Sequence, residues 1–220
     1  LASWKGAGLY SLEHRCSSTE LSSGRTLLSA KHEYFHKGQL LLSSVWRYRA
    51  SAQGGLEVDV SVLVESDTPP LARVGALVRL ADKTADVSWF GRGPHENYPD
   101  RKTGADVDRW RASLDELHTP YIYPSDNGLR CDVTSVDIGQ AAMTGEFAFS
   151  VSEYGLEQLM QADHDHELVT QPGLFVHIDG FHMGVGGDDS WTPSVRPEYL
   201  LSAKQFEWCF KLGTPDSTKG

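Results

Sequence analysis

The clearest pattern in the chain is an alternation of apolar and polar residues between positions 25 and 82. A period of two is typical of β-strands that bury one face. Over residues 56–64 one face is apolar and the other is polar: Leu56, Val58, Val60 and Val62 against Glu57, Asp59 and Ser61. This segment is therefore predicted to be a half-buried strand.

Two further strands are predicted beside it. Residues 39–52 are rich in Leu and Val and contain Trp46 and Tyr48, and a Gln-Gly-Gly break at 53–55 is typical of a hairpin turn. Residues 72–80 follow a Pro-containing turn at 66–70. The order predicts an antiparallel meander.

Residues 89–130 have another character, because they are dense in Gly, Pro, Asn, Asp and aromatic residues without clear periodicity. A loop of this length is expected to be functional or an ordered covering. Further strands are predicted at 146–152, 174–178 and 199–211, with one helix at 155–162. The prediction is one all-β sandwich domain over residues 1–212 and a disordered tail over 213–220.

Composition narrows the possible partners. The 220 residues include 30 acidic and 20 basic ones, and the net charge of −10 is scattered along the chain, which disfavours nucleic acid. The sequence has neither an apolar run near the roughly 20 residues of a membrane span nor the features of a signal peptide. A first residue of Leu1 indicates a piece of something longer.

Three cysteines, Cys16, Cys131 and Cys209, are far apart in sequence. This spacing does not form a disulfide framework or the close pairs of zinc sites. We expect three reduced thiols in a cytoplasmic protein.

Several clusters could carry chemistry, each with a simpler alternative. Residues 163–167 (Asp-His-Asp-His-Glu) could ligate zinc or manganese, but a solvated loop explains them equally well. The Gly-rich segment 184–190 lacks the Lys and the helix of a phosphate loop, so a tight loop is expected. Asp188 with Asp189, and Asp115 with Glu116, are adjacent and therefore point apart, unlike the facing carboxylates of a glycosidase.

Trp191 differs from these clusters because it follows a Gly-rich turn and precedes Thr-Pro, outside any strand periodicity. A flat indole at such a place can pack against the C–H face of a sugar. The alternative is an aromatic ring tucked beneath its own loop.

Three segments carry a family resemblance: WFGRGPHENYPDR at 89–101, TPYIYPSDNGLR at 119–130 and IDGFHMGVGGDDSWTPSV at 178–195. In order and spacing they resemble the C-terminal domain of the large bacterial β-galactosidases of glycoside hydrolase family 2. The resemblance implies a galactose mutarotase-like fold, a large antiparallel supersandwich. It also implies a parent enzyme that hydrolyses terminal β-D-galactosides, such as lactose, with retention.

In that family the two catalytic glutamates and the Mg²⁺ and Na⁺ ligands lie mainly in a preceding barrel domain, so no cofactor and no hydrolysis are expected of this chain alone. The resemblance implies that Trp191 stacks on galactose and, from spacing more than from residues, that a mobile loop at 8–15 with Gly8 and Tyr10 borders the site. The implied partners are the barrel-containing remainder, the galactoside and further copies in a homo-oligomer.

Two alternatives stay open. A free-standing mutarotase-like epimerase would need a His acid and a Glu base that converge on the sugar. His95 with Glu96, or His182, could be proposed, although adjacent residues do not converge. The other alternative is an isolated carbohydrate-binding module in which Trp191 works alone.

Overall fold

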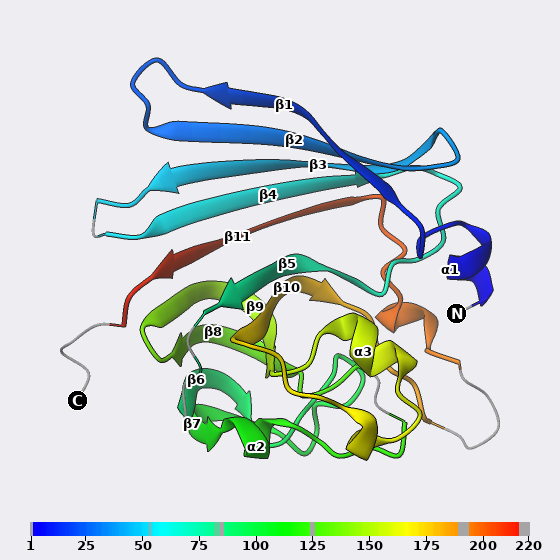
Figure 1. Cartoon of the computed structure of the whole chain (residues 1–220), viewed down its shortest axis with the longest axis vertical. Helices are drawn as coiled ribbons and strands as arrows, with labels where there is room; N and C mark the ends of the chain where they lie inside the picture. The colour runs from blue at the N-terminus through cyan, green and yellow to red at the C-terminus, as the bar shows by residue number, and fades with distance from the viewer. Residues whose placement is uncertain are drawn as a thin grey trace.

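The computed structural model describes residues 2–52, 54–81, 83, 86–123, 126–188 and 194–215. Within these ranges it is an all-β protein with three short helices, as Figure 1 shows. The strands are β1 (Glu13–Leu21), β2 (Leu27–His36), β3 (Gln39–Ala50), β4 (Leu56–Val64), β5 (Arg73–Leu80), β6 (Asp86–Gly93), β7 (Asp106–Ser113), β8 (Arg130–Ile138), β9 (Ala141–Ser152), β10 (Leu174–His182) and β11 (Gln205–Gly213). The helices are α1 (Ala2–Gly6), α2 (Leu114–Leu117) and α3 (Leu156–Gln161), with single 3-10 turns at Asp165–Glu167 and Pro197–Tyr199.

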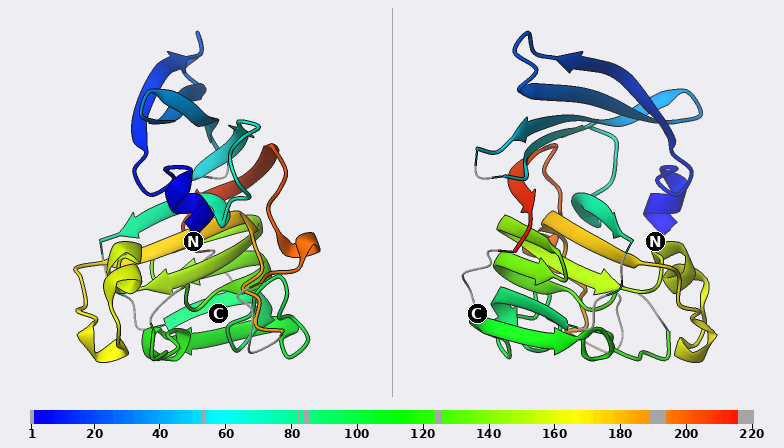
Figure 2. Two further views of the ribbon diagram at one scale, coloured as in Figure 1. Left: turned by 90° about the vertical axis from the view of Figure 1, so that its right-hand side faces the viewer. Right: turned by 60° about the vertical axis from the view of Figure 1, so that its left-hand side comes forward.

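The strands form one large antiparallel sheet in the order β1-β2-β3-β4-β11-β9-β8-β6-β7, while β10 pairs with both β9 and β5. The sheet bends strongly, so that Figures 1 and 2 show an upper half (β1–β4 and β11) and a lower half (β5–β10). The predicted all-β, sandwich-like, antiparallel class is confirmed.

The core lies where the two halves meet. Val58 and Val60 of β4 pack in one cluster with Phe149 of β9, Ile178 of β10 and Phe210 of β11. The strand predicted over 56–64 is confirmed residue for residue, with Val58 1% and Val60 2% exposed. Its alternation thus reports which side faces the core.

The predicted meander is wrong at its third strand. β3 and β4 form the expected antiparallel pair, but β5 pairs with β10, and the other edge of β4 pairs with β11. Along that edge Phe206, Trp208 and Phe210 of β11 lie opposite Val62, Val60 and Val58. The alternation of apolar and polar residues identifies which face of a strand is buried. It does not identify the strand with which it pairs, because that strand can be distant in sequence.

The prediction of a long irregular stretch over 89–130 is also wrong, because it contains most of β6, all of β7 and α2. The glycines that read as loop residues are required by close packing in β6. A Cβ on Gly91 would lie 2.6 Å from a Val133 side-chain carbon in the adjacent strand β8. In β7 only Ala112 is buried, so the strand has little apolar alternation to recognise.

The helix predicted at 155–162 is confirmed as α3, whereas β1 and β8 have no counterpart in the prediction. The strand predicted at 199–211 begins only at Gln205 and continues to Gly213, one residue into the predicted tail, and positions 216–220 lie outside the described residues. None of the helices in the described ranges is long and apolar enough to cross a membrane.

Candidate functional site

The three segments that carry the family resemblance meet at one end of the lower half of the sheet. We call the described residues within 94–104, 118–129 and 183–204 the loop platform. The Asn97 backbone N–H donates to the Leu129 carbonyl at 2.8 Å, and the Cys131 N–H donates to Asn97 Oδ1 at 2.9 Å. The Arg130 guanidinium donates to the Pro94 carbonyl at 3.0 Å. The first two loops are therefore joined by backbone-directed hydrogen bonds.

Asp100 and Arg101 fasten the third loop to the first. The Asp100 carboxylate accepts hydrogen bonds from the Val185 N–H at 3.0 Å and from the Gly186 N–H at 2.7 Å. Arg101 Nη2 donates to the Gly186 carbonyl at 3.2 Å. Hydrogen bonds between a charged side chain and a backbone N–H or carbonyl group are strong and directional. This pair holds both polar groups of the Gly186 backbone.

Gly186 lies close to the Ser194 backbone, and we call this close approach the neck of the third loop. Its φ of 71° lies in the left-handed region, and a Cβ there would lie 2.7 Å from the Ser194 carbonyl oxygen. Only glycine fits such a close approach without strain. The segment between Gly186 and Ser194 thus starts and ends at one point, and Arg196 Nε donates to Asp188 Oδ2 across it at 2.6 Å. Trp191, the predicted sugar-stacking residue, lies in this segment but outside the described residues.

A buried charge network lies beside the platform. Arg73 Nη2 donates to Asp179 Oδ2 at 2.6 Å, and Arg73 Nη1 lies 3.7 Å from Asp126 Oδ1. His182 Nε2 lies 2.5 Å from Asp126 Oδ2, and His182 Nδ1 lies 2.7 Å from the Met183 carbonyl oxygen. Both ring nitrogens of His182 face acceptors, which is the geometry of a protonated imidazolium.

The pKa directions agree with this geometry. Burial favours neutral His182, but the hydrogen bond and the charge of Asp126 outweigh it, so the pKa of His182 is raised. Burial also opposes ionisation of Asp126, yet His182 and Arg73 lower the pKa of its carboxyl. His177 behaves in the opposite way, because burial and the nearby Arg73 charge lower its pKa to about 4.

We expect His182 and His177 to change the free energy of unfolding with pH in opposite directions. The folded pKa of His182 is raised, so its contribution is complete below the unfolded value of about 6.5 and is lost as the pH rises through the folded value. The folded pKa of His177 is depressed, so stability is lost as the pH falls from about 6.5 towards 4. Urea unfolding at several pH values should give the largest free energy of unfolding near pH 6.5.

Single variants separate the two effects. His182→Gln should flatten the slope above pH 6.5, whereas His177→Gln should flatten the slope as the pH falls from about 6.5 towards 4. An unchanged alkaline slope in His182→Gln would show that the imidazolium assignment is wrong.

Gly8 and Tyr10 lie in the turn between α1 and β1. Gly8 has a φ of 79°, and a Cβ there would lie 2.1 Å from the His36 ring, so this turn requires glycine. Tyr10 is 43% exposed, and the Lys5 ammonium lies 5.8 Å from its ring centre. The predicted mobile loop over 8–15 is wrong in its last part, since β1 begins at Glu13 and pairs with β2.

The N-terminal turn and the loop platform border the same end of β5. Trp4 Nε1 donates to the Pro70 carbonyl at 2.7 Å, and the adjacent Leu71 forms a β-bridge with Leu201 of the platform. That Tyr10 and Trp191 border one site stays a prediction, because Trp191 lies outside the described residues.

The other clusters have structural partners. The Glu167 carboxylate accepts from the Asp163 and His164 N–H groups at 2.8 and 3.3 Å, and His118 Nε2 lies 2.6 Å from Asp165 Oδ1. Glu116 caps α2 through Ser113. In the part of the chain that the structure describes, no group of three or more His, Cys, Asp or Glu side chains is placed to hold a metal ion.

The residues proposed for an epimerase also serve the platform. Glu96 Oε2 accepts from the Gly128 N–H at 3.0 Å and from the Tyr98 hydroxyl at 3.3 Å. The His182 side chain is 3% exposed and is held between Asp126 and the Met183 carbonyl. This arrangement gives the epimerase alternative no support.

Sequence reasoning missed Asp100, Arg73, Asp126 and Asp179. One signal was available for two of them: Arg73 and Asp179 are charged residues inside apolar strand patterns, where a buried partner is expected. Asp100 and Asp126 lie in loops and gave no such signal.

A family model described as "Beta galactosidase small chain" matches residues 1–212. A beta-galactosidase of Pectobacterium atrosepticum is 47% identical over 207 residues, which cover 93% of this chain and 20% of that protein. A beta-galactosidase of Aeromonas hydrophila is 44% identical over 212 residues, with 94% and 21% covered. The chain spans about a fifth of the length of these relatives.

Proposed function

The chain belongs to the beta galactosidase small chain family, and from this premise we propose that it forms one wall of the galactose site of a larger retaining β-galactosidase. In this proposal Trp191 stacks on the apolar face of the galactose ring. Gly8 and Tyr10 border the same site. The catalytic glutamates belong to the remainder of the enzyme.

The loop platform is the observation that carries this proposal. Three segments far apart in sequence converge on a hydrogen-bonded base, and Asp100 and Arg101 hold the neck of the loop that contains Trp191. A stacking residue contributes most when its backbone is fixed before the ligand arrives, because less conformational entropy is lost on binding. A neck held by hydrogen bonds is what this role requires.

The carboxylates of the candidate pairs support placing catalysis elsewhere. Glu116 accepts hydrogen bonds at the start of α2, and Asp188 is paired with Arg196. For the Mg²⁺ and Na⁺ of the whole enzyme, the described side chains offer no fitting donor set of His, Cys, Asp or Glu. The proposal assigns this chain no step through a metal ion.

The cellular setting and assembly also belong to the proposal. Cys16 and Cys209 are free and exposed, and Cys131 is free and buried. Exposed free thiols suit the reducing cytoplasm. We place the enzyme there as a homo-oligomer whose chains include a barrel domain, acting on β-galactosides such as lactose.

Replacement of Trp191 by alanine in the parent enzyme should raise the KM for a nitrophenyl β-galactoside about tenfold, since a stacked aromatic ring contributes about 1.5 kcal/mol. Trp191→Phe is the matched control, because phenylalanine keeps a flat ring and should retain most of the affinity. Steady-state kinetics on the three proteins measure the effect. The 220-residue chain alone should release no nitrophenol.

Two results would contradict the proposal. Hydrolysis by the isolated chain would mean that it carries its own catalytic pair. Equal KM values for wild type and Trp191→Ala would remove the tryptophan from the sugar site.

A further inference from the structure

The upper half of the sheet has two chemically different faces. The outer face carries ion pairs between neighbouring strands: Lys211 Nζ lies 2.9 Å from Glu57 Oε1, and Arg49 Nη1 lies 3.4 Å from Glu57 Oε2. Lys31 and Glu33 form a further pair at 2.9 Å on the same face of β2. This is the surface of a sheet that faces water.

The inner face is the side shared with the core residues Val58 and Val60. Strand register places Trp46 opposite Val60 and Ala30, and Tyr48 opposite Val58 and Leu28. The inner face of β1, β2 and β3 carries the apolar and aromatic side chains of Leu21, Leu28, Ala30, Tyr34, Leu42, Trp46 and Tyr48. It also carries His14, Cys16, Thr19, His32 and Ser44, which lie towards the other end of these strands from Leu21 and Leu28. The core thus continues outward from Val58 through Tyr48 and Leu28 to Leu21 as an apolar strip across the sheet.

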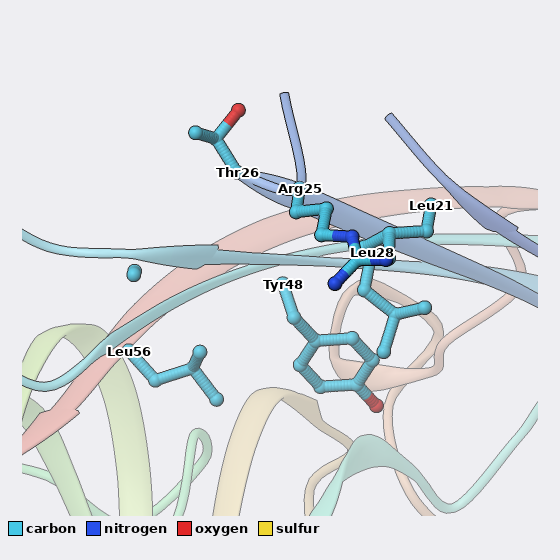
Figure 3. Close-up of a pocket in the computed structure, with 7 residues that line it drawn as sticks. Leu21, Arg25, Thr26, Leu28, Tyr48 and Leu56 are labelled. Carbon is cyan, nitrogen blue, oxygen red and sulfur yellow. The ribbon is translucent and has the colours of Figure 1, made fainter. Parts of the chain in front are cut away.

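This inner face loses its cover towards β1. Val58 is 1% exposed, whereas Leu28 is 41% and Leu21 is 55% exposed. An open hollow of about 340 Å³ lies there, lined by Leu21, Arg25, Thr26, Leu28, Tyr48, Ala50 and Leu56. Figure 3 shows Leu28, Tyr48 and Leu56 pointing from their strands to the same side. A contiguous exposed apolar face of this kind marks an interaction surface.

We propose that the inner face of β1, β2 and β3 is the docking surface for the remainder of the galactosidase, the part that this chain does not span. The inference rests on the proposed function, which requires such a remainder. The size of the relatives supports this occupant, since the matched segment is only 20% of the Pectobacterium protein. The face is continuous with the core, so its cover would extend that core, as permanent interfaces do.

Cys16 and Cys209 lie on opposite faces of the sheet, so the reactivity of each thiol reports whether its face is covered. Cys16 pairs with His32 on the inner side of the sheet, and Cys209 pairs with Asp59 on the outer side. Both are exposed in this chain. Cys131 is buried, and burial raises the pKa of its thiol to about 12, so it reacts slowly and does not interfere.

The experiment is maleimide labelling of the intact parent enzyme, with each thiol quantified by peptide mass spectrometry. Cys209 should react quickly, and Cys16 should react at least tenfold more slowly than Cys209. In the 220-residue chain alone the two thiols should react at similar rates. Equal reactivity in the intact enzyme would overturn the proposal.

A matched pair of leucine variants tests the surface itself. Leu21 and Leu63 are both 55% exposed, but Leu21 lies on the inner face and Leu63 on the outer face. Leu21→Glu in the parent should speed the labelling of Cys16 at least tenfold, because a carboxylate opens an apolar interface. Leu63→Glu should leave the rate unchanged, and equal effects would contradict the inference.

The same labelling distinguishes a second copy of the enzyme as the occupant. Dilution of the oligomer to single protomers should leave Cys16 protected, and a gain in its reactivity would assign the face to another copy and overturn the proposal. Labelling needs no activity, so a failed Trp191 test and a failed docking test are read separately.

Discussion

Replacement of Arg73 by methionine should lower the free energy of unfolding by about 3–5 kcal/mol. The Arg73 guanidinium lies 2.6 Å from the Asp179 carboxylate, whose side chain is only 1% exposed. Methionine keeps much of the apolar stem but leaves Asp179 buried without its countercharge, which is far more costly than losing a surface pair. Urea unfolding followed by tryptophan fluorescence measures the change.

An exposed ion pair supplies the control. Arg111 Nη2 lies 2.5 Å from Asp86 Oδ2, with side-chain exposures of 73% and 46%. Arg111→Met should therefore change the unfolding free energy by less than about 1 kcal/mol. Similar losses in Arg73→Met and Arg111→Met would mean that burial does not decide the strength of the Arg73 pair.

The second large effect is expected from Gly75→Ala, which should destabilise the chain by about 3 kcal/mol. Gly75 of β5 lies opposite Asp179 of β10. A Cβ on Gly75 would lie 2.2 Å from Asp179 Oδ1, 2.6 Å from the Ile178 carbonyl oxygen and 2.8 Å from the Asp179 Cα. Two of these three atoms are backbone, so the strands themselves must move and the Arg73–Asp179 pair is disturbed with them.

Gly104→Ala is the matched control for that substitution. A Cβ on Gly104 meets no atom within 4 Å, and its φ is not in the left-handed region. The same added methyl group should therefore leave the unfolding free energy within about 1 kcal/mol of wild type. Because Gly75 and Arg73 both act through Asp179, the double variant Arg73→Met with Gly75→Ala should lose less than the sum of the two single losses. Additive losses would show that the alanine acts elsewhere.

The strand with the strictest alternation could be predicted from the sequence to the residue, whereas β1 could not be predicted. Residues 56–64 were found because each inward residue is aliphatic and most outward ones are polar. β1 was missed because all nine of its residues are exposed at the end of the sheet, which leaves no buried face to recognise. The pairing of β5 with β10 was not predictable, because the residue pattern within one strand does not say which distant strand lies beside it.

The candidate site could be predicted from the sequence only in part. The motif segments were recognised through their resemblance to a family, but their convergence depends on contacts between distant loops, such as Asp100 with Val185 and Gly186. The buried pair of Arg73 and Asp179 joins positions 106 residues apart. The stacking role of Trp191 remains a prediction, because the residue lies outside the described part of the chain.

The open ends of the sheet have a consequence for solubility. β1 and β7 stand at the two ends of the strand order, and an end strand can recruit strands from other molecules and seed aggregation. β1 carries Glu13, Arg15 and Glu20 and has a register break after Cys16, while β7 carries Asp106, Asp108, Arg109 and Arg111. An incoming strand would have to accommodate these charged side chains and, at β1, match an irregular ladder. These features make β1 and β7 poor templates for fibril growth.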